Sequence, residues 1–280
     1  MKHADLALER LAGEPAIWVT VDATQGSVPR DAGTWMAVFA DAVVGTIGGG
    51  HVEHQVMAQA RRRLAGDTGP AVLRFALGPS LGQCCGGVMM LRLEAVDHTS
   101  IAVLRTRLDS ARIPVALFGG GHVGHALVEV LARLPFAVTW IDSRESVLPT
   151  QTARSVVCEH SEPVQAAVAV LAPGSAVLIM SFSHAEDLDI LAACLQRLRR
   201  TDDLPYIGLI GSKTKWATFR HRLSERGFRD DELERVTCPI GLPGMPGKEP
   251  EVIAVAVAAQ LLQSRPRLAP APRGGESALK

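Results

Sequence analysis

Six residues that follow an apolar, strand-like segment carry glycines at the spacing of a phosphate-binding turn. Gly119, Gly121 and Gly124 fit the pattern G-x-G-x-x-G, and His122 lies between them. Asp142 ends the next predicted strand about 20 residues further on, where dinucleotide-binding proteins place a carboxylate. Such glycines let the backbone approach a phosphate, and the N-terminus of the following helix offers free N–H groups. The turn predicts a phosphate or nucleotide site, unless its glycines serve only the close packing of helix against sheet.

A second glycine-rich loop, residues 78–87, contains the adjacent thiols of Cys84 and Cys85, preceded by Gln83. A thiolate is both a nucleophile and a metal ligand, so either cysteine could bind a soft metal or relay sulfur. Adjacent cysteines form only a strained disulfide, and they lack the C-x-x-C spacing of a structural zinc site. The alternative is that both are small buried residues in a tight turn.

Two segments nearer the N-terminus offer groups that suit an anion. Arg30 lies in the loop of residues 26–33, and its planar guanidinium fits a phosphate or a carboxylate. A run of three glycines leads into a predicted helix and forms a second anion site of the helix N-terminal kind. The ligand-contacting residues expected there are Gly49, Gly50, His51 and Glu53. Otherwise Arg30 is an exposed loop residue, and Glu53 complements the helix dipole.

Two further segments follow predicted strands in the second half, at the strand end where α/β sheets bind ligands. His184, with carboxylates nearby, could bind a metal or move protons. Ser212 is expected to cap a helix, and Lys213 could reach a phosphate. The second segment lacks the spaced glycines of a P-loop, so Walker-type hydrolysis is not expected.

The elements that must position these groups have two different patterns. Residues 1–97 combine short β-branched strands with one amphipathic helix, which predicts an α+β domain. Residues 114–263 alternate strands and helices, which predicts a Rossmann-like parallel sheet with helices on both faces. We expect a linker over residues 98–113, and a disordered tail rich in Pro, Ala, Gly and Arg over residues 264–280.

Composition limits the class of protein. The chain has 280 residues, of which 47% are hydrophobic and 21% charged, as in a globular protein with a sizeable core. Lys+Arg and Asp+Glu balance at 29 each, which argues against nucleic acid or an acidic membrane as a partner. No apolar run has the form of a signal peptide or a membrane span. The five cysteines do not resemble a disulfide framework, so we expect a cytoplasmic protein.

Taken in order, these segments resemble the XdhC/CoxI family of xanthine dehydrogenase accessory proteins. The matching stretches, spread over residues 8–263, are GSVPRDAG, VVGTIGGGHVE, LGPSLGQCCGG, LFGGGHVGHALVEVLA, TWIDSRE, YIGLIGSKTK and CPIGLPG…KEPEVIAVAVAAQLL. One departure is Ser183 before His184, where the family usually has threonine. Serine keeps the hydroxyl group, so the difference is a minor one.

The resemblance implies a chaperone that binds the molybdenum cofactor (molybdopterin), protects it, supports its sulfuration and inserts it into xanthine dehydrogenase. A cysteine desulfurase is the implied sulfur donor, and Cys84 or Cys85 would lie near the molybdenum. The implied role is that of a maturation factor and not of an enzyme. We also expect a homodimer, because parallel sheets with apolar helices often pair.

Two other functions fit part of the pattern. An NAD(P)-dependent oxidoreductase would share the glycine turn and Asp142, but no acid/base set for a substrate accompanies the second half. A nucleotide-binding regulatory module would use the same turn without chemistry. Bound molybdopterin would favour the family role over both.

Overall fold

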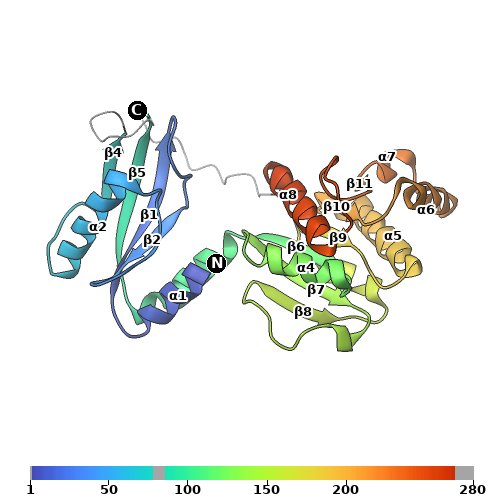
Figure 1. Cartoon of the computed structure of the whole chain (residues 1–280), viewed down its shortest axis with the longest axis horizontal. Coiled ribbons are helices and arrows are strands. Elements are labelled where there is room, and N and C mark those ends of the chain that lie inside the picture. The colour runs from blue at the N-terminus through green and yellow to red at the C-terminus, as the bar shows by residue number, and fades with distance from the viewer. Residues whose placement is uncertain (1, 78–85, 269–280) are drawn as a thin grey trace. The chain divides into compact units, whose positions relative to one another are not determined.

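A computed structural model describes residues 2–77 and 86–268, which form two compact units divided between Ser110 and Ala111 (Figure 1). The first unit contains an antiparallel sheet and the second a parallel sheet, each with helices packed against it. The predicted fold class is therefore confirmed. The segment predicted as a linker carries the 3-10 helix η2 (His98–Ser100) and the helix α3 (Ile101–Ser110), both in the first unit.

The first unit is built on a five-stranded antiparallel sheet of strand order β3-β2-β1-β5-β4. Besides η2 and α3, its elements are α1 (Lys2–Leu11), β1 (Ala16–Gln25), β2 (Trp35–Val38), β3 (Val43–Gly45), α2 (Gly50–Leu64), β4 (Val72–Ala76) and β5 (Val88–Val96). The central strand β1 pairs with β5 along its length, from Ala16 opposite Val96 to Gln25 opposite Val88.

Helices cover both faces of this sheet, which explains the uninterrupted apolar start of β1. Successive side chains of a strand point to opposite faces. Accordingly, Ile17 and Val19 pack in the core that contains the buried residues of α2, while Trp18 packs with α1 and α3. The apolar stripe of α2 consists of Val52, Val56, Ala60 and Leu64, of which the first three are buried.

The second unit is a six-stranded sheet of order β11-β10-β9-β6-β7-β8, in which every pair is parallel. Its strands are β6 (Ile113–Phe118), β7 (Phe136–Asp142), β8 (Val156–His160), β9 (Ala176–Ile179), β10 (Tyr206–Leu209) and β11 (Val236–Thr237). Its helices are α4 (His122–Leu131), η3 (Glu145–Val147), η4 (Val164–Val170), α5 (His184–Thr201), α6 (Lys213–Glu225), α7 (Asp230–Leu233) and α8 (Pro250–Leu268).

Two separate cores hold the layers of this unit together. The side chains of Val115 and Leu117 pack with α4 and α8 on one face of β6. Those of Ala116 and Phe118 pack with η4, α5 and α6 on the other. Both faces of the sheet are therefore buried, as parallel sheets require. Among the helices of residues 2–77 and 86–268, none is long and apolar enough to cross a membrane.

Candidate functional site

The strand order reverses between β6 and β9, so their carboxyl ends are the expected ligand-binding edge of the sheet. The chain proceeds from β6 to β7 and β8 on one side, and then crosses to β9, β10 and β11 on the other. Neighbouring strands at which the order reverses are where open parallel sheets bind ligands. Gly119 follows β6 at this point, and a Cβ added to it would lie 2.0 Å from the carbonyl oxygen of Met180, which follows β9. A side chain at Gly119 is therefore excluded by packing.

The neighbouring glycines of the turn differ in why they lack a side chain. A Cβ on Gly124 would lie 2.2 Å from the Gly119 carbonyl oxygen, and one on Gly120 would lie 2.6 Å from Val147. At Gly121, in contrast, an added Cβ would meet no described atom within 4 Å beyond the adjoining residues of its own chain segment, and its φ of −79° suits any residue. Packing therefore explains the other three glycines but not Gly121, which borders open space.

The helix that begins after this turn has no side chain capping its N-terminus. Gly121 is the N-cap of α4 and offers no hydrogen-bonding group. Two other helices that begin at this edge of the sheet, α5 and α6, are capped by their own serines: Ser183 accepts from the backbone N–H of Glu186, and Ser212 accepts from that of Lys215. Unlike those of α5 and α6, the first N–H groups of α4 are thus left for an anionic ligand.

Asp142 is buried at the end of β7, and its carboxylate holds the turn. Its Oδ2 accepts a hydrogen bond from the Gly120 N–H at 2.5 Å, and both oxygens accept from the Arg144 guanidinium at 3.0 Å. Burial alone would raise the pKa of this carboxyl, but the hydrogen bonds from Arg144 and Gly120 outweigh it and lower the pKa. The carboxylate is committed to the protein's own donors and is not presented to a ribose.

A buried ion pair joins the carboxyl ends of β9 and β10. Lys215 of α6 donates to Asp187 of α5 at 2.6 Å and to the Ile210 carbonyl oxygen at 2.9 Å. Asp187 also accepts from the backbone N–H and the hydroxyl of Ser181. This pair fixes the first turns of both helices. The carboxylate of Asp187 therefore binds Lys215 and Ser181, while His184 lies exposed at the start of α5.

The second-unit residues predicted to bind a ligand all lie at this carboxyl edge. They are Gly119, Gly121, His122, Gly124, Asp142, His184, Ser212 and Lys213. His122 and Lys213 are exposed, and Ser212 has the predicted capping role. Within residues 2–77 and 86–268, no three His, Cys, Asp or Glu side chains gather as a metal site would require.

In the first unit, Glu53 holds the three-glycine turn from inside. Its Oε2 accepts from the Thr46 hydroxyl at 2.6 Å, from the Ile47 N–H at 2.9 Å and from the Gly49 N–H at 3.0 Å. The turn needs glycine, because Gly49 and Gly50 have φ values of 75° and 71°. The carboxylate therefore already occupies a donor that an anionic ligand would use.

The loop of residues 26–33 lies against this turn and also against Gly87, the last residue of the glycine-rich loop that carries Cys84 and Cys85 (residues 78–87, the cysteine loop). A Cβ on Gly48 would lie 2.8 Å from Pro29 and 3.3 Å from Arg30. A Cβ on Gly87 would lie 2.4 Å from the Ser27 carbonyl oxygen. The N–H of Leu77 donates to the Gly87 carbonyl oxygen at 2.8 Å and joins the two stems of the cysteine loop. The 26–33 loop, the three-glycine turn and Gly87, the last residue of the cysteine loop, thus meet at one end of the first sheet.

The predicted ligands Gln83, Cys84 and Cys85 lie outside the described residues. Arg30 and His51 are exposed, and His51 shares a hydrogen bond of 2.9 Å with Gln55.

The three described cysteines are not poised as thiolates. Burial raises the pKa of the Cys158 thiol, and it raises those of Cys194 to about 12 and of Cys238 to about 11. These thiols are protonated at neutral pH and are therefore poor nucleophiles and poor metal ligands.

Comparisons with known proteins agree with this architecture. The family model of the XdhC Rossmann domain matches residues 115–261, and that of the XdhC and CoxI family matches residues 10–76. The uncharacterized protein YqeB of Escherichia coli (strain K12) is 28% identical over 247 residues, which are 86% of this chain and 42% of that protein. The chain therefore spans less than half the length of this relative.

A solved crystal structure from Bacillus halodurans, described as a xanthine dehydrogenase, has the same fold. Its similarity has a TM-score of 0.73 at 21% identity, and it covers 99% of this chain and 98% of that chain.

Proposed function

Because the chain belongs to the XdhC and CoxI family, we propose that it is an accessory protein that binds the molybdenum cofactor and inserts it into xanthine dehydrogenase. The observation that carries this proposal is the open glycine turn at the end of β6. Gly121 borders free space where the strand order reverses, and α4 begins there without a capping side chain. The cofactor carries a phosphate on its pterin, and a helix N-terminus of this kind suits a phosphate.

The metal end of the cofactor calls for a soft ligand, and the proposal assigns this role to Cys84 or Cys85. The described cysteines are held as neutral thiols by burial. Gly87, which follows the 78–85 segment, lies beside Ser27. Ser27 and Arg30 belong to one loop, that of residues 26–33. A thiol pair carried there could hold the molybdenum or relay sulfur during sulfuration. A cysteine desulfurase as sulfur donor and a homodimer are further parts of the proposal.

The environment of Asp142 favours this role over NAD(P)-dependent oxidation. A dinucleotide site of that class presents a carboxylate to the ribose hydroxyl. Here both oxygens of Asp142 accept hydrogen bonds from the protein, and its side chain is 1% exposed. A ribose would have to displace Arg144 to reach it.

The test is the molybdopterin content of the chain after anaerobic purification from a host that makes the cofactor, read as its fluorescent oxidation product. We expect wild-type protein to retain molybdopterin, and Cys84→Ala or Cys85→Ala to lose most of it. Gly121→Val should lower retention about tenfold, equivalent to about 1.4 kcal/mol, because its side chain fills the space beside the helix N-terminus. Cys158→Ala is the matched control and should load normally.

Each part of the proposal fails on a different result. Wild-type protein without molybdopterin would contradict cofactor binding altogether. Normal loading of both Cys84→Ala and Cys85→Ala would remove the thiols from the site. Normal loading of Gly121→Val would remove the glycine turn.

A further inference from the structure

An arginine and an aromatic ring are stacked beside the glycine turn. The guanidinium carbon of Arg144 lies 4.3 Å from the centre of the Phe182 ring, which is a cation–π contact. The guanidinium is held in place without a ligand, because its Nε and Nη2 donate to the two oxygens of Asp142. The backbone N–H of Arg144 donates to the same carboxylate at 2.8 Å. The plane of the guanidinium group is therefore fixed, and a third of the Arg144 side chain is exposed.

Phe182 is exposed where a protein would ordinarily bury an aromatic ring. The residue is 67% exposed, and none of the other exposed large apolar residues of the described chain is aromatic. An aromatic side chain left in water forgoes a large part of the free energy that burial of its ring would provide. An exposed ring that follows a parallel strand at its carboxyl end, where such sheets bind ligands, offers a surface on which a flat molecule can stack.

Both residues border the glycine turn, each by a different connection. Asp142 accepts from the Gly120 N–H with the same oxygen that accepts from Arg144. Phe182 directly follows Ser181, whose Cα lies 3.1 Å from a Cβ added to Gly119. The stacked pair thus lies across the carboxyl ends of β7 and β9, on the two sides of the turn that follows β6.

We infer that Arg144 and Phe182 form a stacking platform for the flat heterocycle of a ligand whose phosphate lies at the 119–121 turn. Aromatic rings and guanidinium planes both stack on heterocycles, and one stacked base is worth about 1–3 kcal/mol, or roughly 5- to 150-fold in affinity. The inference rests on the proposed function and refines it, because it names the residues that bind the ring. A pterin and a nucleobase share the required chemistry, and the experiment separates them.

The experiment compares how tightly the full chain binds a phosphate ligand that carries a ring and one that does not. Calorimetric titrations of cofactor-free protein use inorganic pyrophosphate, GMP and CMP, and molybdopterin retention is measured in parallel. Phe182→Ser removes the ring, Phe182→Trp restores an aromatic surface, and Val170→Ser alters an equally exposed apolar residue of η4. Because Phe182 is mostly exposed, none of these changes should disturb the fold, which circular dichroism checks.

We expect Phe182→Ser to weaken binding of the ring-bearing ligand at least fivefold while leaving pyrophosphate affinity unchanged. Phe182→Trp should restore wild-type affinity, and Val170→Ser should match wild type. An effect on GMP or CMP identifies a nucleotide form as ligand, and an effect on molybdopterin retention alone identifies the pterin. The inference is overturned if Phe182→Ser changes neither the affinity for GMP and CMP nor the retention of molybdopterin. Wild-type protein that binds nucleotides through Phe182 but holds no molybdopterin would contradict the proposed function and leave the platform standing.

Discussion

At the scale of single residues, the glycine turn separates structural from ligand-directed positions. Gly124 lies too close to the Gly119 carbonyl oxygen for any side chain, whereas Gly121 faces open space. We expect Gly124→Ala to destabilise the chain by about 1–3 kcal/mol, because the added methyl overpacks the contact of α4 with the turn. Gly121→Ala should change stability by less than about 1 kcal/mol, since its backbone conformation already suits alanine. Urea unfolding of both variants measures this, and equal losses would refute the distinction.

A second residue-scale prediction concerns acid stability. Arg197 is buried and donates to Asp203, and also to the Val168 and Leu171 carbonyl oxygens at the end of η4. The hydrogen bonds from Arg197 lower the pKa of Asp203 to about 2, from an ordinary value of 3.8. A lowered carboxyl pKa stabilises the fold above pH 3.8, and the contribution is lost as the pH falls toward 2.

Asp203→Asn should therefore cost about 1–2 kcal/mol of unfolding free energy at pH 7, and the difference from wild type should shrink between pH 4 and pH 2. Denaturant unfolding across this range is the measurement. Asp202→Asn serves as the control, because its side chain is 70% exposed and pairs only with the exposed Arg235 in the described contacts. A gap that stays constant down to pH 2 would show that Asp203 acts by its shape and not by its charge.

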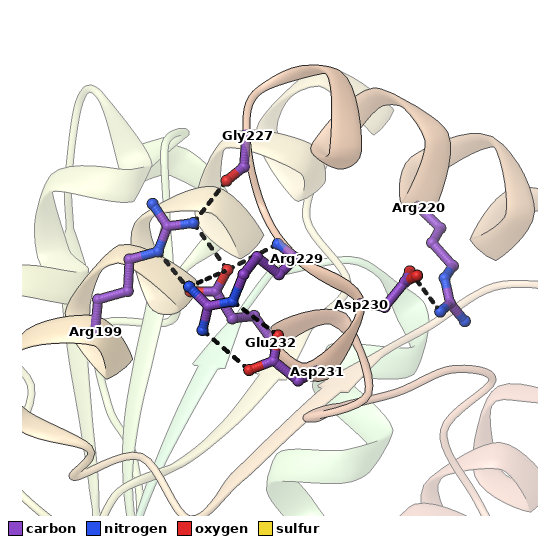
Figure 2. A network of polar contacts seen from close by, with 7 residues as sticks. All are labelled: Arg199, Arg220, Gly227, Arg229, Asp230, Asp231 and Glu232. Atoms are coloured by element: carbon purple, nitrogen blue, oxygen red, sulfur yellow. Dashed lines mark hydrogen bonds and ion pairs between the residues drawn. The ribbon is translucent and has the colours of Figure 1, made fainter.

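At the scale of elements, a polar network attaches the short helix α7 to the rest of the second unit (Figure 2). Glu232 accepts from the Arg199 guanidinium of α5 and from the Arg229 N–H, and so caps α7 from within. Arg199 also donates to the Gly227 carbonyl oxygen and stacks on Phe228. A four-residue helix has little stability of its own, so these contacts hold it.

We therefore expect Glu232→Ala to raise amide hydrogen exchange across residues 228–237 by about tenfold, as the loss of roughly 1.4 kcal/mol would do. The other helices of the unit should exchange at their wild-type rates. Asp231→Ala is the matched control, since Asp231 is exposed and binds Arg229 alone in the described contacts. Exchange that rises equally in both variants would contradict the assigned role of Glu232.

Sequence patterns predict well the elements whose apolar residues or glycines follow a regular spacing along the chain. The strands of residues 35–47 form a hairpin in which Val38 pairs with Val43, and the predicted glycine turn does follow β6 and precede α4. The sequence does not reveal α3, α7 or β11. Only Leu104 of α3 is buried, and α7 and β11 have four and two residues. Helical periodicity needs about 11–18 residues to be recognised, so tertiary contacts decide these elements.

The candidate site shows the same division. Glycine spacing correctly predicts a turn that enters a helix, because backbone conformation is a local property. It does not predict that Asp142 binds Arg144, nor that Phe182 lies beside the turn, because these contacts join the ends of different strands. Glu53 is a similar case: its position in the first turn of α2 suggests a ligand, and its hydrogen bonds assign it to the turn itself.

At the scale of the whole molecule, the two units differ in how their glycine turns are satisfied. In the first unit the carboxylate of Glu53 accepts a hydrogen bond from the Gly49 N–H in the turn before α2, whereas in the second unit Gly121, before α4, borders open space. The phosphate of a ligand is therefore expected at the second unit, while the cysteine loop belongs to the first. The proposed function gives these features a common purpose, which is to carry a phosphate-bearing metal pterin to another protein.

The most direct test of that purpose is transfer of cofactor to the client. Chain purified with bound molybdopterin is mixed anaerobically with cofactor-free xanthine dehydrogenase, and recovery of dehydrogenase activity is followed against equimolar free cofactor. We predict faster and more complete activation by the loaded chain, together with loss of molybdopterin from it in equal amount. Activation no better than that by free cofactor, with molybdopterin still on the chain, would contradict the proposed function.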